Sequence, residues 1–88
     1  MAAHEATLEF DYDRPSRAAL VADSVAREIG EIDDDRSRTT LERTDSRVLV
    51  EIDADDVIAL RAAVNTWFSL IDVAERTADV GEAALESR

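Results

Sequence analysis

The spacing of apolar residues over positions 53–76 predicts one long helix. The apolar positions that recur at helical spacing form a broad stripe: Val57, Leu60, Val64, Trp67, Phe68 and Ile71. Three aspartates, Asp53, Asp55 and Asp56, precede the stripe and can supply oxygen atoms and negative charge to the free amides of the first helical turn. We therefore expect the helix to begin at this acidic segment.

This helix also has a second, weakly polar flank. At about 100° per residue, a group of mostly small side chains falls away from the stripe: Ala59, Ala62, Ala63, Thr66, Leu70 and Val73. A helix so apolar in so short a chain is expected to pack against its own domain and also against a partner. We predict that the stripe holds the fold and that the small-residue flank binds a partner.

Shorter patterns lie upstream of the long helix. Alternation over 7–12 predicts a strand, and Pro15 opens a helix over 15–29 that Gly30 ends. Strands over 38–44 and 47–53 form a hairpin whose two-residue turn is Asp45 and Ser46. The strand residues expected to face the core are Leu8, Phe10, Tyr12, Leu41, Val48, Val50 and Ile52.

The element order predicts an α+β fold, β-α-β-β-α. We expect a two-layer sandwich, with a three-stranded antiparallel sheet and two helices on one face. Residues 1–76 form one domain with a loose lead over 1–5, and residues 77–88 form a flexible or partner-dependent tail. A three-stranded sheet has two open edges, and open edges invite pairing with another chain. A homodimer is expected on this ground.

Charge is the strongest compositional signal. Acidic residues number 21 against 10 bases, the net charge is −11, and every base is arginine. This balance is typical of proteins from extreme halophiles, because at about 1 M salt the Debye length is only ~3 Å and self-repulsion is screened. Binding of a phosphate backbone by the chain alone is disfavoured, since few phosphates could be neutralised.

The sequence offers little for catalysis. It has no cysteine, its one histidine, His4, lies in the expected lead, and the acidic run 33–35 lacks the spacing of an EF-hand loop. We expect no catalytic residue, no metal and no cofactor, and therefore no enzyme. No apolar run approaches the ~18 residues of a membrane span and no signal peptide is evident, so we expect a cytoplasmic protein without a membrane partner.

Two polar pairs are candidate contact residues. Arg36, followed by Ser37, could clamp a carboxylate or phosphate through two hydrogen bonds, although an ion pair with acidic neighbours is the favoured interpretation. Arg61 and Asn65 lie one helical turn apart and could bind a partner or face water.

Three stretches resemble a known family. They are L-E-F-D-Y-D-R-P-S-R-A, E-I-G-E-I-D-D-D-R-S-R over 28–38, and D-D-V-I-A-L-R-A-A-V-N-T-W-F-S-L-I-D-V-A-E over 55–75. The chain is similar in these stretches to the PCC / CTAG / LAGE family, the smallest core subunit of the KEOPS (EKC) complex. The best motifs are D-R-S at 35–37 and A-L-R-A-A-V-N-T at 59–66, and the resemblance covers nearly all of 7–76.

The resemblance implies a non-catalytic, dimerising subunit whose fold is similar to KH-type folds in outline. Such subunits pack their helices against the N-terminal helices of a Kae-type catalytic subunit. The complex adds threonylcarbamoyl to the adenosine next to the anticodon in ANN-decoding tRNAs, and tRNA is bound only within the complex. Arg36, Ser37, Arg61 and Asn65 match polar positions of the family. The acidic composition departs from a large tRNA-binding role.

Two other functions stay open from the residues alone. A stand-alone KH-like nucleic-acid-binding domain would need a G-x-x-G loop, which the sequence lacks. A small ligand-sensing domain would need a deep apolar pocket instead of a flat helical face.

Overall fold

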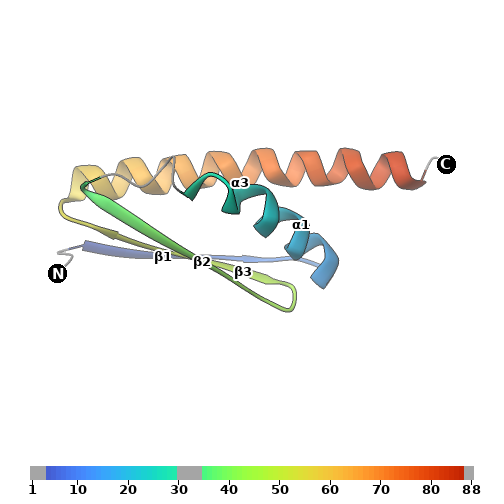
Figure 1. Ribbon diagram of the computed structural model, residues 1–88, viewed down its shortest axis with the longest axis horizontal. Coiled ribbons are helices and arrows are strands. Elements are labelled where there is room, and N and C mark those ends of the chain that lie inside the picture. The colour runs from blue at the N-terminus through green and yellow to red at the C-terminus, as the bar shows by residue number, and fades with distance from the viewer. Residues whose placement is uncertain (1–3, 30–34, 87–88) are drawn as a thin grey trace.

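The computed structural model of the chain describes residues 4–29 and 35–86, with side chains described as far as Gly81. The elements in chain order are β1 (His4–Asp11), α1 (Pro15–Ala26), β2 (Ser37–Thr44), β3 (Arg47–Ala54) and α3 (Val57–Glu86). The three strands form one layer, and both helices lie on the same face of it (Figure 1). The predicted α+β class, with its β-α-β-β-α order, is confirmed.

The sheet is antiparallel, and β3 is its central strand in the order β1-β3-β2. Val50 pairs with Leu8 on one side and with Leu41 on the other, so the predicted inward residues share one face. Val48, Val50 and Ile52 are completely buried because β3 is flanked by both neighbours and covered by the helices.

The hairpin between β2 and β3 has the predicted two-residue turn. Thr44 pairs with Arg47, which leaves Asp45 and Ser46 as the loop. Asp45 has a φ of 54°, in the left-handed region. Two-residue turns that match the twist of the strands need a positive φ at the first loop position, so this strained residue follows from the short connection.

The start of β1 and the end of α1 differ from the predicted positions. His4 and Glu5 belong to β1, paired with Ala54 and Asp53, where we expected part of a loose lead. Residues 1–3 lie outside the described residues. Helix α1 ends at Ala26 instead of 29, and the predicted stop at Gly30 also lies outside them.

Helix α3 begins where the acidic segment predicts. The backbone N–H of Ala59 donates a hydrogen bond of 2.7 Å to Oδ1 of Asp56, which therefore caps the helix. The helix does not end at 76 but continues through Gly81 to Glu86, and its distal part extends past the sheet (Figure 1). A glycine inside a helix costs only about 1 kcal/mol, which the helix-forming residues around it can offset. The dependence of 77–88 on a partner stays a prediction.

Part of this helix, Val57–Gly81, is long and apolar enough to cross a membrane by length and composition alone. The stretch is not an unbroken apolar run, because charged residues such as Arg61 and Asp72 interrupt it. Only 22% of the most apolar stretch of this segment is buried in the domain. The helix therefore exposes more apolar surface than a core helix normally does.

Candidate functional site

The side of α3 that faces the domain is rich in alanine. Its buried residues are Ala63, Trp67, Ile71, Ala74 and Ala78. The small alanines allow α1 to approach closely, and α1 brings its own buried residues, Ala18, Val21, Ala22 and Val25, to the same cluster. Compared with the predicted apolar stripe, the buried side of α3 is therefore rotated toward its alanines.

This rotation corrects the predicted division of the helix. Val57 and Phe68, expected in the core, are 44% and 50% exposed. Phe68 lies at the margin of the sheet instead, where its ring meets that of Phe10 edge to face, with centroids 6.0 Å apart. Ala63, expected on the partner-binding flank, is 5% exposed and belongs to the core. A helical pattern alone does not fix which side the second helix covers.

Trp67 lies at the centre of the core. It is completely buried, and its indole Nε1 donates a hydrogen bond of 3.2 Å to Oγ1 of Thr39 on β2. Thr39 is itself buried, so each polar group satisfies the other. This contact fixes α3 against the sheet.

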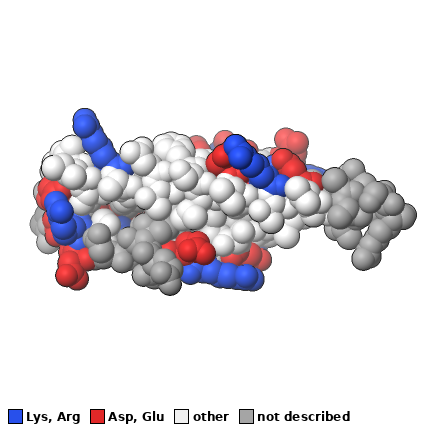
Figure 2. All heavy atoms as spheres, turned by 90° about the horizontal axis from the view of Figure 1, so that it is seen from above, with Lys and Arg blue, Asp and Glu red and all other residues white. Residues whose placement is uncertain are grey.

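The outer face of α3 exposes large apolar side chains to solvent. We define it by the exposed residues Ile58, Ala62, Thr66, Val73 and Val80. Ile58 is 74% exposed, Val73 58% and Val80 70%. The Thr66 hydroxyl donates to the carbonyl of Ala62 at 2.9 Å, so it is satisfied within the helix. Viewed onto the helix, a broad uncharged area lies between charged groups (Figure 2).

The predicted flank overlaps with this outer face only in part. Ala62, Thr66 and Val73 are exposed, whereas Ala59 and Leu70 are half-buried. An unpartnered apolar face in a chain of net charge −11 points to binding of another protein. Partner binding by these residues stays a prediction.

Arg36 makes the ion pair that we favoured. Its guanidinium donates to Asp56, the residue that caps α3, and neighbouring Arg38 pairs with Asp55 at 3.2 Å. The hydrogen bond from Arg36, and after it the amide of Ala59, lowers the pKa of Asp56 below its usual range. The arginine of the D-R-S motif thus has a structural role at the start of α3.

The other candidate polar residues differ in their exposure. Ser37 is 4% exposed at the start of β2 and does not present a free surface. Arg61 and Asn65 are exposed on α3, one turn apart as predicted. A partner could therefore reach these two residues of α3 but not Ser37.

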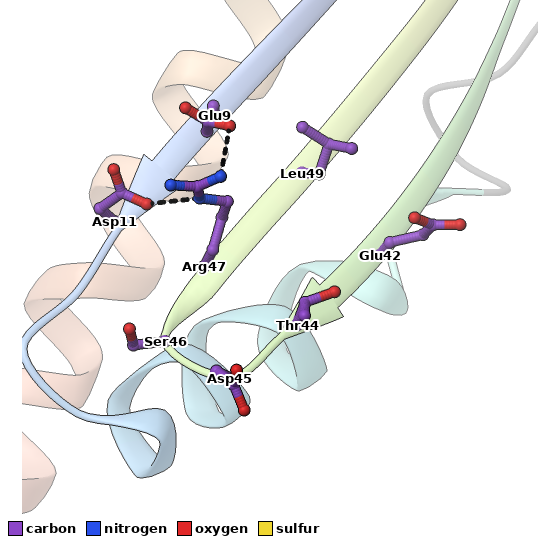
Figure 3. Close-up of a pocket in the computed structure, with 8 residues that line it drawn as sticks. All are labelled: Glu9, Asp11, Glu42, Thr44, Asp45, Ser46, Arg47 and Leu49. Carbon is purple, nitrogen blue, oxygen red and sulfur yellow. Dashed lines mark hydrogen bonds and ion pairs between the residues drawn. The ribbon is translucent and has the colours of Figure 1, made fainter.

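The outer face of the sheet carries a hollow of about 450 Å³ near the hairpin turn. Figure 3 shows Arg47 reaching from β3 to β1, where it pairs with Glu9 at 3.1 Å and Asp11 at 2.8 Å. The hydrogen bond with Asp11 raises the pKa of Arg47. The remaining lining residues are Glu42, Thr44, Asp45, Ser46 and Leu49. The arginine is committed to two carboxylates, so this hollow does not suit a phosphate.

The described residues offer no metal centre, since no group of three His, Asp or Glu side chains among them could hold an ion. This observation covers the described ranges alone. The expectation that the chain binds no metal and no cofactor stays a prediction.

A polar network that the sequence did not reveal ties the distal half of α3 to the domain. The Tyr12 hydroxyl donates to Oε2 of Glu75 at 2.7 Å, and Arg17 pairs with Asp79 at 2.6 Å. The Arg17 guanidinium also lies 5.9 Å from the centre of the Tyr12 ring. These residues are more than sixty positions apart in sequence, so no local pattern could have shown the contact.

A family model described as "Transcription factor Pcc1" matches residues 5–79. Among solved structures, a chain of the "Crystal structure of binary complex Gon7-Pcc1" is similar, with a TM-score of 0.71 and 17% identity. The match covers 91% of this chain and 98% of the chain in that structure. At this identity the likeness shows the fold alone. Among curated proteins, none matches the chain.

Proposed function

The chain belongs to the Pcc1 family of KEOPS subunits, and we propose that it is the non-catalytic scaffold that binds and activates a Kae-type catalytic subunit. In this proposal the assembled complex threonylcarbamoylates the adenosine next to the anticodon in ANN-decoding tRNAs. The similar solved structure is a binary complex of Gon7 and Pcc1, which agrees with a role of this fold in assembly. A cytoplasmic, halophilic setting is part of the same proposal.

The outer face of α3 carries this proposal. Ile58, Val73 and Val80 are more than half exposed along one helix, whereas the chain is otherwise strongly acidic. Burial of such side chains contributes about 25 cal/mol per Å² of apolar surface, so a partner that covers them gains affinity without needing charge complementarity. Helices of a catalytic subunit, packed against α1 and α3, would provide that cover.

A homodimer can form at a different surface. The edge strand β1 leaves Leu8 and Phe10 only half-buried, and the half-exposed Phe68 lies beside Phe10. A second chain that pairs along this edge would cover these side chains and satisfy the free backbone groups of the edge. Because Phe68 is on another side of α3 from Val73, the dimer and the catalytic subunit need not compete.

Binding of tRNA is proposed only within the complex. On the outer sheet face, Arg47 is held by Glu9 and Asp11, and near the start of α3, Arg36 is held by Asp56. Exposed bases that are already paired with carboxylates neutralise few phosphates. These contacts also disfavour the stand-alone nucleic-acid-binding alternative, which measurable RNA affinity of the isolated chain would support.

Co-purification tests the proposal. The chain is co-expressed with the Kae-type subunit of the same organism, and the products are analysed by size-exclusion chromatography with light scattering in molar salt. We expect a dimer of the isolated chain and a stable complex with the catalytic subunit. A folded chain that forms neither would overturn the proposed function.

A further inference from the structure

Two residues from the start of the helix layer hold the distal part of α3. The Tyr12 hydroxyl donates to Glu75 at 2.7 Å, and Arg17 of α1 pairs with Asp79 at 2.6 Å. The Arg17 guanidinium lies 5.9 Å from the centre of the Tyr12 ring, so the two contacts adjoin. The backbone N–H of Tyr12 donates to the carbonyl of Ser46 at 2.8 Å, which fixes Tyr12 to the hairpin. We call Tyr12, Arg17, Glu75 and Asp79 the clamp.

The charged residues of the clamp do not suit the helices that carry them. Arg17 lies in the first turn of α1, where a positive charge opposes the helix dipole and no acidic residue offsets it. Glu75 and Asp79 are like charges at i and i+4 of α3, a spacing at which they repel each other. The pairing of Arg17 with Asp79 compensates both effects at once. These residues therefore stabilise the contact between the helices and not the separate helices.

Packing supports α3 only as far as the clamp. Among the side chains described, which extend to Gly81, Ala78 is the last one that is buried. Val80 is 70% exposed, and Gly81 weakens the helix locally without packing against anything within 4 Å. The helix nevertheless continues to Glu86, beyond the sheet (Figure 1). Its last turns therefore depend on what holds their beginning at Asp79.

We propose that the clamp controls local unfolding of the end of α3. While the clamp is closed, the helix is continuous to Glu86. When the clamp opens, Glu75 and Asp79 repel each other, and the segment 79–86 loses its helical structure while the sheet and the rest of the helix layer stay folded. Val80 of the outer face belongs to this segment, so the clamp also sets how much of the outer face is formed. The inference concerns the free chain and does not depend on the function proposed above.

Native-state hydrogen exchange, read by mass spectrometry, measures this local opening. The backbone amides of 79–86 report the end of α3, and those of 67–74 are the internal reference for the folded domain. Wild type is compared with Arg17→Gln, with Asp79→Asn and with the double variant, all in the same salt. Arg76→Gln is the matched control, because it removes an arginine whose pair, Asp72, lies on α3 itself at 2.9 Å.

We expect the amides of 79–86 to exchange faster than those of 67–74 in the wild type. Arg17→Gln should accelerate exchange at 79–86 about fivefold to thirtyfold, although the substitution is more than sixty positions away. Asp79→Asn should accelerate it about twofold to fivefold, whereas an isolated helix would be unchanged or slower, because the repulsion with Glu75 is removed. The double variant should exchange no faster than Arg17→Gln alone, since both substitutions break one contact.

Three results would overturn the inference. Unchanged exchange at 79–86 in Arg17→Gln would show that the clamp does not hold the end of α3. Equal acceleration at 67–74 and 79–86 would show that the end of α3 unfolds only together with the whole domain. Equal acceleration by Arg76→Gln and Arg17→Gln would assign the effect to the loss of any positive charge and not to the clamp.

Discussion

Arg36 and Asp56 form an ion pair that joins the start of β2 to the start of α3. Asp56 also accepts the backbone N–H of Ala59, so one carboxylate is both the cap of the long helix and the partner of the D-R-S arginine. The motif that we considered as a contact for phosphate thus has a role in positioning α3.

Removal of the Asp56 carboxylate should destabilise the chain. We expect Asp56→Ala to lower the melting temperature by about 4–8 °C, the shift that loss of a typical cap gives in a domain of this size. Asp56→Asn should lose less, because its amide oxygen can still cap the helix. Equal loss in both variants would assign the effect to the ion pair instead of the cap.

The same pair predicts a dependence on acid pH. The folded-state pKa of Asp56 is lowered, so its stabilisation is complete above the unfolded pKa of about 3.9 and is lost as pH falls through the folded value. Thermal melts between pH 7 and pH 2 should therefore show the wild type approaching Asp56→Asn as pH falls. A difference that does not change with pH would contradict the pairing.

Ionisation of Tyr12 should limit the stability of the fold at alkaline pH. Burial, and after it the hydrogen bond to Glu75, raises the pKa of Tyr12 above its ordinary value. The neutral phenol is favoured in the folded state, so stability is complete below about pH 10 and falls as pH rises beyond it. Tyr12→Phe should lose a few degrees of melting temperature at pH 7 and flatten the alkaline loss.

Absorbance gives an independent check of the same group. Tyr12 is the only tyrosine of the chain, so phenolate absorbance reports this side chain alone. Ionisation at the pH of free tyrosine, in a chain that is still folded, would contradict the buried hydrogen bond.

The hairpin turn should be improved by glycine. Asp45 has a φ of 54°, a conformation that glycine adopts without the steric cost of a Cβ. We expect Asp45→Gly to raise the free energy of unfolding by about 0.5–1 kcal/mol and Asp45→Val to lower it, measured by urea denaturation. A stabilising valine would be incompatible with the positive φ.

Two adjacent alanines should separate assembly from folding. Ala62 is exposed on the outer face, whereas Ala63 is 5% exposed in the core. We expect Ala62→Glu to keep the melting temperature within about 2 °C and to reduce binding of the Kae-type subunit at least about tenfold. Ala63→Glu should unfold the chain, because it buries an unpaired charge. Unchanged binding by folded Ala62→Glu would remove the outer face from the interface.

High salt should stabilise the isolated chain. The net charge of −11 gives self-repulsion that a Debye length of about 10 Å at 0.1 M leaves in place and that ~3 Å at 1 M largely screens. We expect the melting temperature to rise between 0.1 M and 2 M KCl. A double variant, Glu42→Gln with Glu51→Gln on the exposed sheet face, should show a smaller rise. A fall with salt would contradict the halophilic interpretation.

The fold could be predicted because its signals are local. Alternation placed Val48, Val50 and Ile52 on one face of β3, and the short Asp45–Ser46 connection fixed the hairpin. The end of α3 could not be predicted in this way. A glycine often marks the end of a helix. Gly81 lies on an open helix surface, where a glycine lowers helix stability only slightly, so the helix continues through it.

The candidate site was harder to predict, because it depends on how two helices pack. The pattern of α3 showed surplus apolar surface but not its direction. Close approach of α1 buried Ala63, Ala74 and Ala78 and left the larger Phe68 at the margin. The contacts of Tyr12 with Glu75 and of Arg17 with Asp79 depend on the same packing.

The hydrogen bond from Trp67 to Thr39 also gives the protein a built-in optical probe. Trp67 is the only tryptophan, it contacts the helix layer and the sheet at once, and Thr39 belongs to an edge strand. Its emission should shift to longer wavelength when the chain unfolds, because the indole then enters water. A partner strand that pairs at the β2 edge, opposite the β1 edge proposed for the dimer, would alter the same emission in a chain that stays folded. Unfolding and pairing at the β2 edge could therefore be followed in one cuvette, without a chemical label.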